Sequence, residues 1–230
     1  MREIVFDTET TGLSAQGGHR IFEIGMVELD SRMPTGRTFH HYLDPERELS
    51  PDSIRITGVT DAQLVGKPYF RDIAADLLAF VGDSPLIAHN AGFDMSFLNN
   101  ELSLLGFEPL SNTVKDTLGM ARKLFPGSRH TLDALCKRFN VSLHNEREFH
   151  GALLDARLLA EVYVELTGGL QGNLLGGTVT EVTVTETVVV ESISVSALLT
   201  RAPLVLEPTA DEAAAHAAAV AKLKQSLWVA

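Results

Sequence analysis

The sequence predicts an α/β fold in which a mixed central sheet is flanked by helices. Three strand-like segments follow one another at about 2–8, 22–30 and 38–44, which is typical of antiparallel strands joined as a meander. After them, strand-like segments alternate with helical patterns, which is typical of parallel strands beneath covering helices. The two patterns together indicate antiparallel and parallel pairing within one sheet.

The elements after the meander follow in a regular order. An amphipathic helix is expected at about 70–81, where Ile73, Leu77 and Val81 share one apolar face. The further expected helices are short pieces within 50–65 and longer segments at 93–105, 117–124, 131–139 and 151–167, and the further expected strands span 85–89 and 113–116.

The composition changes after Thr167. Two glycine pairs, 168–169 and 176–177, follow the last expected helix. Residues 178–196 are almost all Thr, Val, Ser, Glu and Ile, so they could form an extended tether, a strand added to a partner's sheet or an aggregation-prone segment. From Asp211 an alanine-rich run favours a short helix. We therefore expect an extended C-terminal tail, and we divide the chain into a folded domain at 1–167, a linker or tether at 168–207 and a C-terminal segment at 208–230.

The composition also bears on the class and location of the protein. Hydrophobic residues make up 45% of the chain, which is enough for a buried core. The single cysteine, Cys136, lies in a helical pattern, where we expect a buried small hydrophobe, and no disulfide can form within the chain. The sequence shows neither a signal-peptide pattern nor an apolar run of the ~18 residues that a membrane span needs. A cytoplasmic protein without a membrane partner is expected.

The net charge of −11 argues against a protein that holds nucleic acid by bulk electrostatics. Positive charge supplies most of the nonspecific affinity for a phosphate backbone. Both the first 167 residues and the remainder carry more acids than bases. A weak intrinsic grip on nucleic acid is expected, as suits an enzyme that must release it or that a partner holds there.

Two carboxylates lie at the end of the first strand. The apolar run 4–6 is followed by Asp7 and Glu9. Because side chains alternate along a strand, the two acids should point to the same side, about 7 Å apart. They would repel each other unless a cation lies between them, and such hard oxygen ligands suit Mg²⁺ or Mn²⁺. A strand end with exposed acids is the alternative.

Acids recur in similar surroundings downstream. Asp94 follows a second apolar strand and a turn of small residues, where a helix should begin. His150 and Asp155 lie at the start of the last expected helix. Five positions along a regular helix place two side chains about 140° apart, so both cannot face one site from it. We therefore expect His150 in the preceding loop and Asp155 near the first turn.

These groups form ordered motifs, namely D-x-E at 7–9, N-x-x-F-D at 90–94 and H-x-x-x-x-D at 150–155. In this order and on these element types they resemble the histidine branch of the DEDD exonuclease superfamily. The resemblance implies a ribonuclease H-like fold with the metal site on the central strands. It also implies two divalent ions, Mg²⁺ or Mn²⁺, as cofactors of phosphodiester hydrolysis.

The resemblance gives each residue of this set a role. Asp7 would bind both ions. Glu9 and Asp155 would supply further oxygen ligands, and Asp94 would act directly or through water. His150, with an ordinary pKa of about 6.5, could take a proton from the attacking water near neutral pH. Taken singly, His150 could be a surface histidine and Asp155 an acid that suits the helix dipole.

Substrate contacts are expected beside the acids. The family holds the terminal nucleotide and wedges its base in the neighbourhoods that correspond here to Thr10, Leu13, His89, Asn90 and Phe93. Leu13 and Phe93 could equally be core residues, and Asn90 could form a turn.

Other polar residues receive no role. The segment 54–60 resembles the family's I-H-G-[IV]-T segment, but Thr57 stands where a histidine is usual, so no function is carried over to it. Five further histidines lack comparable surroundings and are expected to be surface or structural residues: His40, His41, His130, His144 and His216.

Two stretches, 151–170 and 227–230, resemble the epsilon subunits of bacterial DNA polymerase III. This resemblance implies that the tail docks on the polymerase alpha subunit, with Leu227 and Trp228 as candidate contacts. Trp228 is the only tryptophan of the chain, and tryptophan is enriched at binding hot spots.

A second contact is implied with the sliding clamp. In the family a segment after the nuclease domain touches the clamp, and Gln171, Leu174 and Leu175 resemble its Q-x-x-L-[LF] peptide. A polar linker is the alternative interpretation of this stretch. A small accessory subunit is a further candidate partner.

The sequence thus leads to the hypothesis of a 3′–5′ exonuclease that removes mispaired deoxynucleotides as monophosphates from a single-stranded 3′ end of DNA. It would serve as the proofreading subunit of a replicative polymerase. A frayed terminal base is cheaper to unstack than a paired one, which is a physical basis for selecting mispairs. Two alternatives stay open: an RNA exonuclease similar to oligoribonuclease, and a non-catalytic structural subunit of the polymerase.

Overall fold

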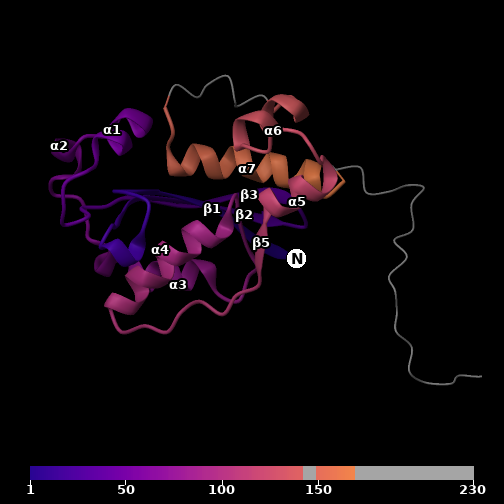
Figure 1. Cartoon of the computed structure of the whole chain (residues 1–230). Coiled ribbons are helices and arrows are strands. Elements are labelled where there is room, and N and C mark those ends of the chain that lie inside the picture. Colours follow the sequence, from indigo (N-terminus) through magenta and orange to yellow (C-terminus); the bar gives the residue numbers. More distant parts are fainter. Residues whose placement is uncertain (142–148, 169–230) are drawn as a thin grey trace, which may run out of the picture. The chain divides into compact units, whose positions relative to one another are not determined.

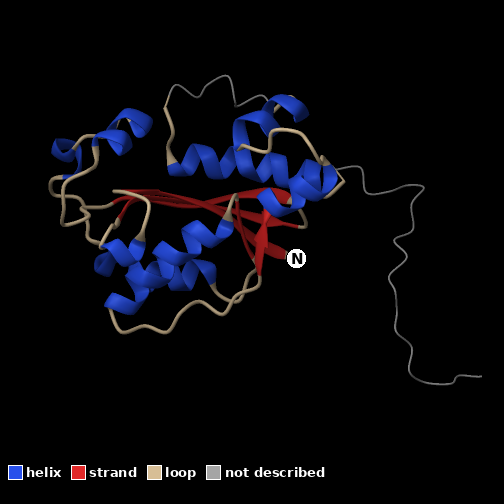
Figure 2. Cartoon of the chain, in the orientation of Figure 1, coloured by secondary structure: helices blue, strands red, loops and turns tan. Residues whose placement is uncertain are grey.

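The computed structural model describes residues 1–141 and 149–168, which form a five-stranded mixed sheet with helices on both faces (Figures 1 and 2). The strands lie in the order β3-β2-β1-β4-β5. Pairing is antiparallel between β1, β2 and β3, and parallel between β1, β4 and β5. The mixed sheet is confirmed. The strand bounds are β1 Arg2–Thr10, β2 Ile21–Asp30, β3 Met33–Tyr42, β4 Leu86–Ala88 and β5 Val114–Asp116.

The helices of the described residues form two layers and a flanking pair. They are α1 (Pro51–Thr57), α2 (Asp61–Leu64), α3 (Phe70–Val81), α4 (Ala91–Leu104), α5 (Thr117–Leu124), α6 (Leu132–Phe139) and α7 (Ala152–Leu166). Figure 1 shows α3 and α4 on one face of the sheet, and α5, α6 and α7 on the other. The pair α1 and α2 lies at the side, near the end of β1.

The buried residues of β1 alternate between the two layers. Ile4 and Phe6 belong to a core cluster that contains Phe97 of α4, whereas Val5 belongs to a cluster that contains Leu159 of α7. Odd-numbered side chains of this strand therefore face α7, and even-numbered ones face α4. This alternation extends into the polar end of the strand.

Most expected bounds agree with the structure within two residues, but the third strand does not. It begins at Met33 rather than near residue 38, because Ser31 and Arg32 adopt positive φ angles of 52° and 67° and reverse the chain within two residues. In the sequence, Pro34 and Gly36 are residue types typical of loops. In the structure both lie in β3, an edge strand, where the missing N–H of a proline leaves no neighbouring strand without a donor.

Other expectations meet different outcomes. The structure adds a short 3₁₀ turn at Ala15–Gly17 that the sequence pattern did not indicate. Cys136 is fully buried, as expected. The proposed domain boundaries stay a prediction, because 169–230 lies outside the described residues. In the described part of the chain, no helix is both long and apolar enough to cross a membrane.

The start of α7 lies directly on β2 at Gly25, which pairs with Asp7 of β1. A Cβ atom on Gly25 would lie 2.3 Å from the backbone nitrogen of Leu153 and 2.4 Å from its Cα. These are backbone atoms, so a side-chain rotation could not make room. The absence of a side chain at Gly25 therefore sets how closely the first turn of α7 approaches the sheet.

We expect Gly25→Ala to lower the free energy of unfolding by about 2 kcal/mol, because overpacking displaces backbone. Urea unfolding at fixed pH measures this. Gly92→Ala is the matched control: a Cβ on Gly92, in the first turn of α4, has no neighbour within 4 Å, and φ is not positive. That change should stabilise the protein by about 0.5 kcal/mol. Equal stability of Gly25→Ala and wild type would contradict the close approach.

Candidate active site

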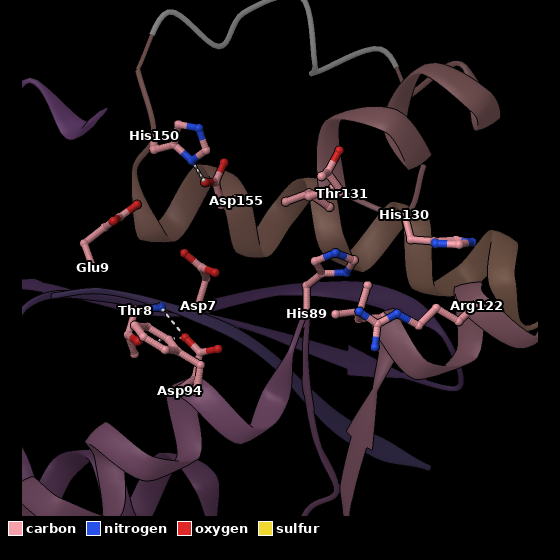
Figure 3. A pocket seen from close by; sticks show the side chains of 13 residues that line it. Asp7, Thr8, Glu9, His89, Asp94, Arg122, His130, Thr131, His150 and Asp155 are labelled. Atoms are coloured by element: carbon pink, nitrogen blue, oxygen red, sulfur yellow. Dashed lines mark hydrogen bonds and ion pairs between the residues drawn. The ribbon is translucent and has the colours of Figure 1, made fainter. Parts of the chain in front are cut away.

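A cavity of about 540 Å³ lies at the carboxyl ends of β1 and β4 (Figure 3). Its acids come from three elements: Asp7 and Glu9 from β1, Asp94 from α4 and Asp155 from α7. His150, which precedes α7, also lines it. The structure therefore brings together the four acids and the histidine that the sequence singled out.

Asp7 and Glu9 are positioned by the alternation of β1. Both are half-buried and project toward α7, whereas the intervening Thr8 projects toward α4 (Figure 3). The pleat of a single strand thus supplies two acids to one side of the cavity and an anchoring hydroxyl to the other.

Thr8 holds Asp94 in place. Its backbone N–H and its hydroxyl both donate to Oδ1 of Asp94, at 3.1 and 2.7 Å. Asp94 is only 3% exposed. Burial raises its pKa to about 7, with a smaller rise from the charge of Asp116, and the Thr8 hydrogen bonds oppose the shift.

His150 and Asp155 meet across the beginning of α7. His150 lies in the loop, Gly151 caps the helix and Asp155 lies in the first turn, as predicted. His150 Nδ1 is 3.2 Å from Asp155 Oδ2, and the His150 backbone N–H donates to Ile56 O at 3.2 Å. Glu9, His150 and Asp155 each offer one atom that could bind a metal ion, and these three atoms lie within 4.8 Å of one another. This spacing and the hard carboxylate oxygens fit a small divalent cation.

His89 lines the cavity but is also tied into the fold. Its Nδ1 is 2.9 Å from Thr117 Oγ1, and it forms a hydrogen bond with the backbone of His130. Burial lowers the pKa of His89, so the ring is neutral near pH 7. His89 thus links the end of β4 to α5 and to the loop after it.

The other expected substrate contacts separate into three kinds. Thr10 and Leu13 line a neighbouring cavity of about 580 Å³, and Leu13 is 89% exposed, which excludes a core role. Phe93 lines both cavities and packs on Phe97, with ring centroids 5.0 Å apart, so it is both a core-edge and a wall residue. Asn90 lines neither cavity; it has φ 69° and precedes α4, as a turn former does.

Sequence reasoning missed the far wall of the first cavity. His130 was expected to be a surface or structural residue, but it lines this cavity together with Leu118, Arg122, Thr131 and Leu132. Their proximity arises because β5 is parallel to β4, so α5, which follows β5 directly, begins at the same edge of the sheet as Asp94. The order of strands and helices is the only signal that could have indicated it.

The remaining polar residues are consistent with structural roles. The Thr57 hydroxyl donates to Ser53 O at 2.8 Å within α1, and Thr57 lines neither cavity. His40 Nε2 is 2.8 Å from Glu23 Oε1, and the His41 ring packs on Phe39. The following residues lie outside the described part of the chain: His144, Gln171, Leu174, Leu175, His216, Leu227 and Trp228.

Comparisons with known proteins decide the family. The family model described as Exonuclease matches residues 4–163. DNA polymerase III subunit epsilon of Rickettsia felis is 56% identical over 176 residues, covering 74% of this chain and 76% of that protein. The chain belongs to the DNA polymerase III epsilon subunits of the exonuclease family. The Escherichia coli epsilon subunit is 46% identical over 176 residues, covering 73% of this chain and 72% of its own.

Membership of the epsilon subunits establishes the activity: the chain is a proofreading 3′–5′ exonuclease.

Solved structures agree in fold. Exonuclease X in complex with 5′ overhanging duplex DNA gives a TM-score of 0.57 at 26% identity, covering 72% of this chain and 90% of that one. The nuclease domain of 3′hExo, a DEDDh family member bound to rAMP, gives 0.61 at 20% identity, covering 72% and 91%. The ribonuclease H-like fold is therefore confirmed.

The pKa of Asp94 should make the stability of the metal-free protein depend on pH. The folded protein holds the Asp94 proton up to about pH 7, and the unfolded chain loses it near pH 4. The stabilising contribution is therefore fully present below pH 4 and is lost as pH rises toward and through 7.

We expect Asp94→Asn to remove this contribution, since the amide oxygen can accept the same bonds from Thr8. The free energy of unfolding of wild type relative to the variant should fall by up to about 4 kcal/mol between pH 4 and 8. Chemical denaturation in EDTA across this range measures it. Asp83→Asn, at an exposed acid before β4, is the control. Parallel curves for wild type and Asp94→Asn would refute the assignment.

Proposed function

We propose that this epsilon subunit removes mispaired deoxynucleotides from the 3′ end of DNA with two divalent ions, Mg²⁺ or Mn²⁺, held by Asp7, Glu9, Asp94 and Asp155. The observation that carries the proposal is the convergence of all four carboxylates on the cavity that His150 lines. Carboxylate oxygens are the ligands that both ions prefer. When bound, such ions acidify the attacking water and stabilise the charge that develops on the phosphate.

His150 is proposed to accept the proton of the attacking water. Its side chain is 46% exposed, so water can reach it, whereas Asp155 is buried. With Nδ1 directed at the Asp155 carboxylate, Nε2 is the nitrogen that takes the proton. Asp155 fixes the orientation of the ring.

Phe93 and Leu13 are proposed to contact the terminal nucleotide. Phe93 lies in the wall shared by the two cavities, and Leu13 projects from the second. An aromatic ring and an exposed apolar side chain beside the acids suit stacking on, and wedging of, an unpaired base. Thr10 also lines the second cavity, and His89 supports the first.

The proposal extends to partners and location. Relatives at 46–56% identity are named as subunits of DNA polymerase III, which supports assembly with a polymerase. We propose that 208–230 binds the polymerase alpha subunit through Leu227 and Trp228, and that Gln171, Leu174 and Leu175 bind the sliding clamp. A small accessory subunit is a third proposed partner, and the complex is proposed to work in the cytoplasm. The net charge of −11 agrees with delivery to DNA by a partner.

Digestion of a 5′-labelled DNA primer tests the activity and its residues. We expect one-nucleotide shortening with Mg²⁺ or Mn²⁺, faster at a terminal mismatch and absent in EDTA. Asp7→Asn should abolish it because the ion site loses charge, and His150→Ala should reduce kcat about 10²- to 10⁴-fold. Asp83→Asn should match wild type.

The same assay separates the alternatives. Cleavage of an RNA oligonucleotide but not of the DNA primer would favour an RNA exonuclease and refute the proposed substrate. An unchanged rate in Asp7→Asn would refute the proposed metal site. The absence of shortening under all conditions would favour a structural subunit.

Deletion of 208–230 should abolish complex formation with the alpha subunit while exonuclease activity on single-stranded DNA survives. Within this segment, Trp228→Ala should weaken binding about 30-fold or more, as is typical of a hot spot, whereas Gln225→Ala should not. Titration calorimetry with the purified alpha subunit measures both. Loss of activity together with binding would place the segment in the catalytic fold and contradict the proposed division.

A further inference from the structure

The cavity has a basic wall opposite its acids, formed by His89, Arg122 and His130. Figure 3 shows Arg122 on the far side of His89 from Asp7 and Glu9. Of the described residues that line the cavity, Arg122 alone carries a permanent positive charge. In a protein with a net charge of −11, this cation lines the same cavity as the acids.

The two histidines of this wall support its shape. His89 Nδ1 is 2.9 Å from Thr117 Oγ1 at the start of α5. His130 Nε2 is 2.7 Å from the carbonyl oxygen of Phe125, which closes the loop after α5. Because protein groups already engage both rings, Arg122 is the member of the wall best placed to bind a ligand.

Arg122 is presented by a short but well-anchored helix. It lies in the last turn of α5, whose first turn is capped by Asp116, with Oδ1 accepting from Leu118 N at 3.1 Å and Oδ2 from Gly119 N at 3.2 Å. Ala121, next to it, is fully buried. The backbone that carries the guanidinium is therefore fixed, while the side chain itself is exposed.

Arg122 also differs from the paired arginines of the fold. Five arginines in the described residues lie within 4.0 Å of a carboxylate, namely Arg2, Arg20, Arg37, Arg55 and Arg71. Within the same part of the chain, Arg122 forms no such pair. Its five N–H donors, in a fork that matches phosphate oxygens, are thus available to a ligand.

The chemistry of a 3′ end determines which phosphate this can be. The terminal nucleotide carries a 3′ hydroxyl and no 3′ phosphate. Every other phosphate of the strand therefore lies on the 5′ side of the scissile phosphate. The scissile phosphate belongs with the acids at the other end of the cavity. A strand that continues along the wall therefore brings its next phosphate to the basic end.

We propose that Arg122 binds the backbone phosphate immediately 5′ to the scissile phosphate. The inference rests on the proposed function of the acid site, and it gives that site a second subsite for a phosphodiester anion. Arg122 acts there by binding and aligning the strand. Two phosphates are then recognised, one at the acids and one at Arg122, so a substrate with a single phosphodiester is cut less efficiently than a longer one.

The test uses three short DNA substrates without 5′-phosphate: a dinucleotide, a trinucleotide, and the same trinucleotide with a neutral methylphosphonate at the upstream linkage. For wild type, kcat/KM should be about 10- to 100-fold higher on the normal trinucleotide than on the other two, as expected for one charge-assisted contact. Arg122→Ala should lose this advantage and cut all three equally. Lys123→Ala, at the adjacent exposed cation that does not line the cavity, should behave as wild type.

The dinucleotide serves as the internal control, because it lacks the upstream phosphate. Equal rates of wild type and Arg122→Ala on it show that the variant is folded and its acid site intact. If Arg122→Ala still discriminated between the normal and methylphosphonate trinucleotides, the two changes would act independently and the inference would be overturned. Failure of wild type to cut any DNA substrate would instead overturn the proposed function.

Discussion

Side chains along β1 alternate between two helical layers, and the acids of the site are placed with respect to that alternation. Asp7 and Glu9 face α7, which brings Asp155 and His150 toward them. Thr8 faces the other layer, and its two hydrogen bonds fix Asp94. A one-residue slip of β1 in the sheet would turn Asp7, Thr8 and Glu9 to the opposite layers, so the register of this strand determines the geometry of the site.

The same arrangement places carboxylates in very different surroundings. Asp7 and Glu9 are half-buried at the end of a strand, whereas Asp94 and Asp155 are buried in the first turns of α4 and α7. Burial favours the neutral form of an acid, and the raised pKa of Asp94 follows from it. A bound cation reverses that preference, because it favours the carboxylate. If Asp94 is a metal ligand, as proposed, burial and charge pairing with the ion would act in opposite directions on its pKa.

Local patterns allowed much of the site to be predicted from the sequence. Asp7, Asp94 and Asp155 each lie at a strand end or in a first helical turn, and their motifs are short. Two members of the basic wall, Arg122 and His130, could not be predicted in this way, because they join the cavity only through the pairing of β5 with β4. The sequence left open whether Leu13 and Phe93 are core residues. Their burial in the structure decides this, because Leu13 is exposed and Phe93 is half-buried. Residues outside the described part keep their roles as predictions.

The backbone hydrogen bond from His150 N–H to the carbonyl oxygen of Ile56 connects two segments that lie far apart in the sequence. Ile56 belongs to α1 and lines the second cavity, while His150 lines the first. Phe149 packs against the same segment, since a Cβ on Gly58 would lie 3.2 Å from its ring. A displacement of α1 would therefore also move the backbone at His150. The walls of the two cavities thus share a mechanical support, and a change in the shape of α1 would alter both.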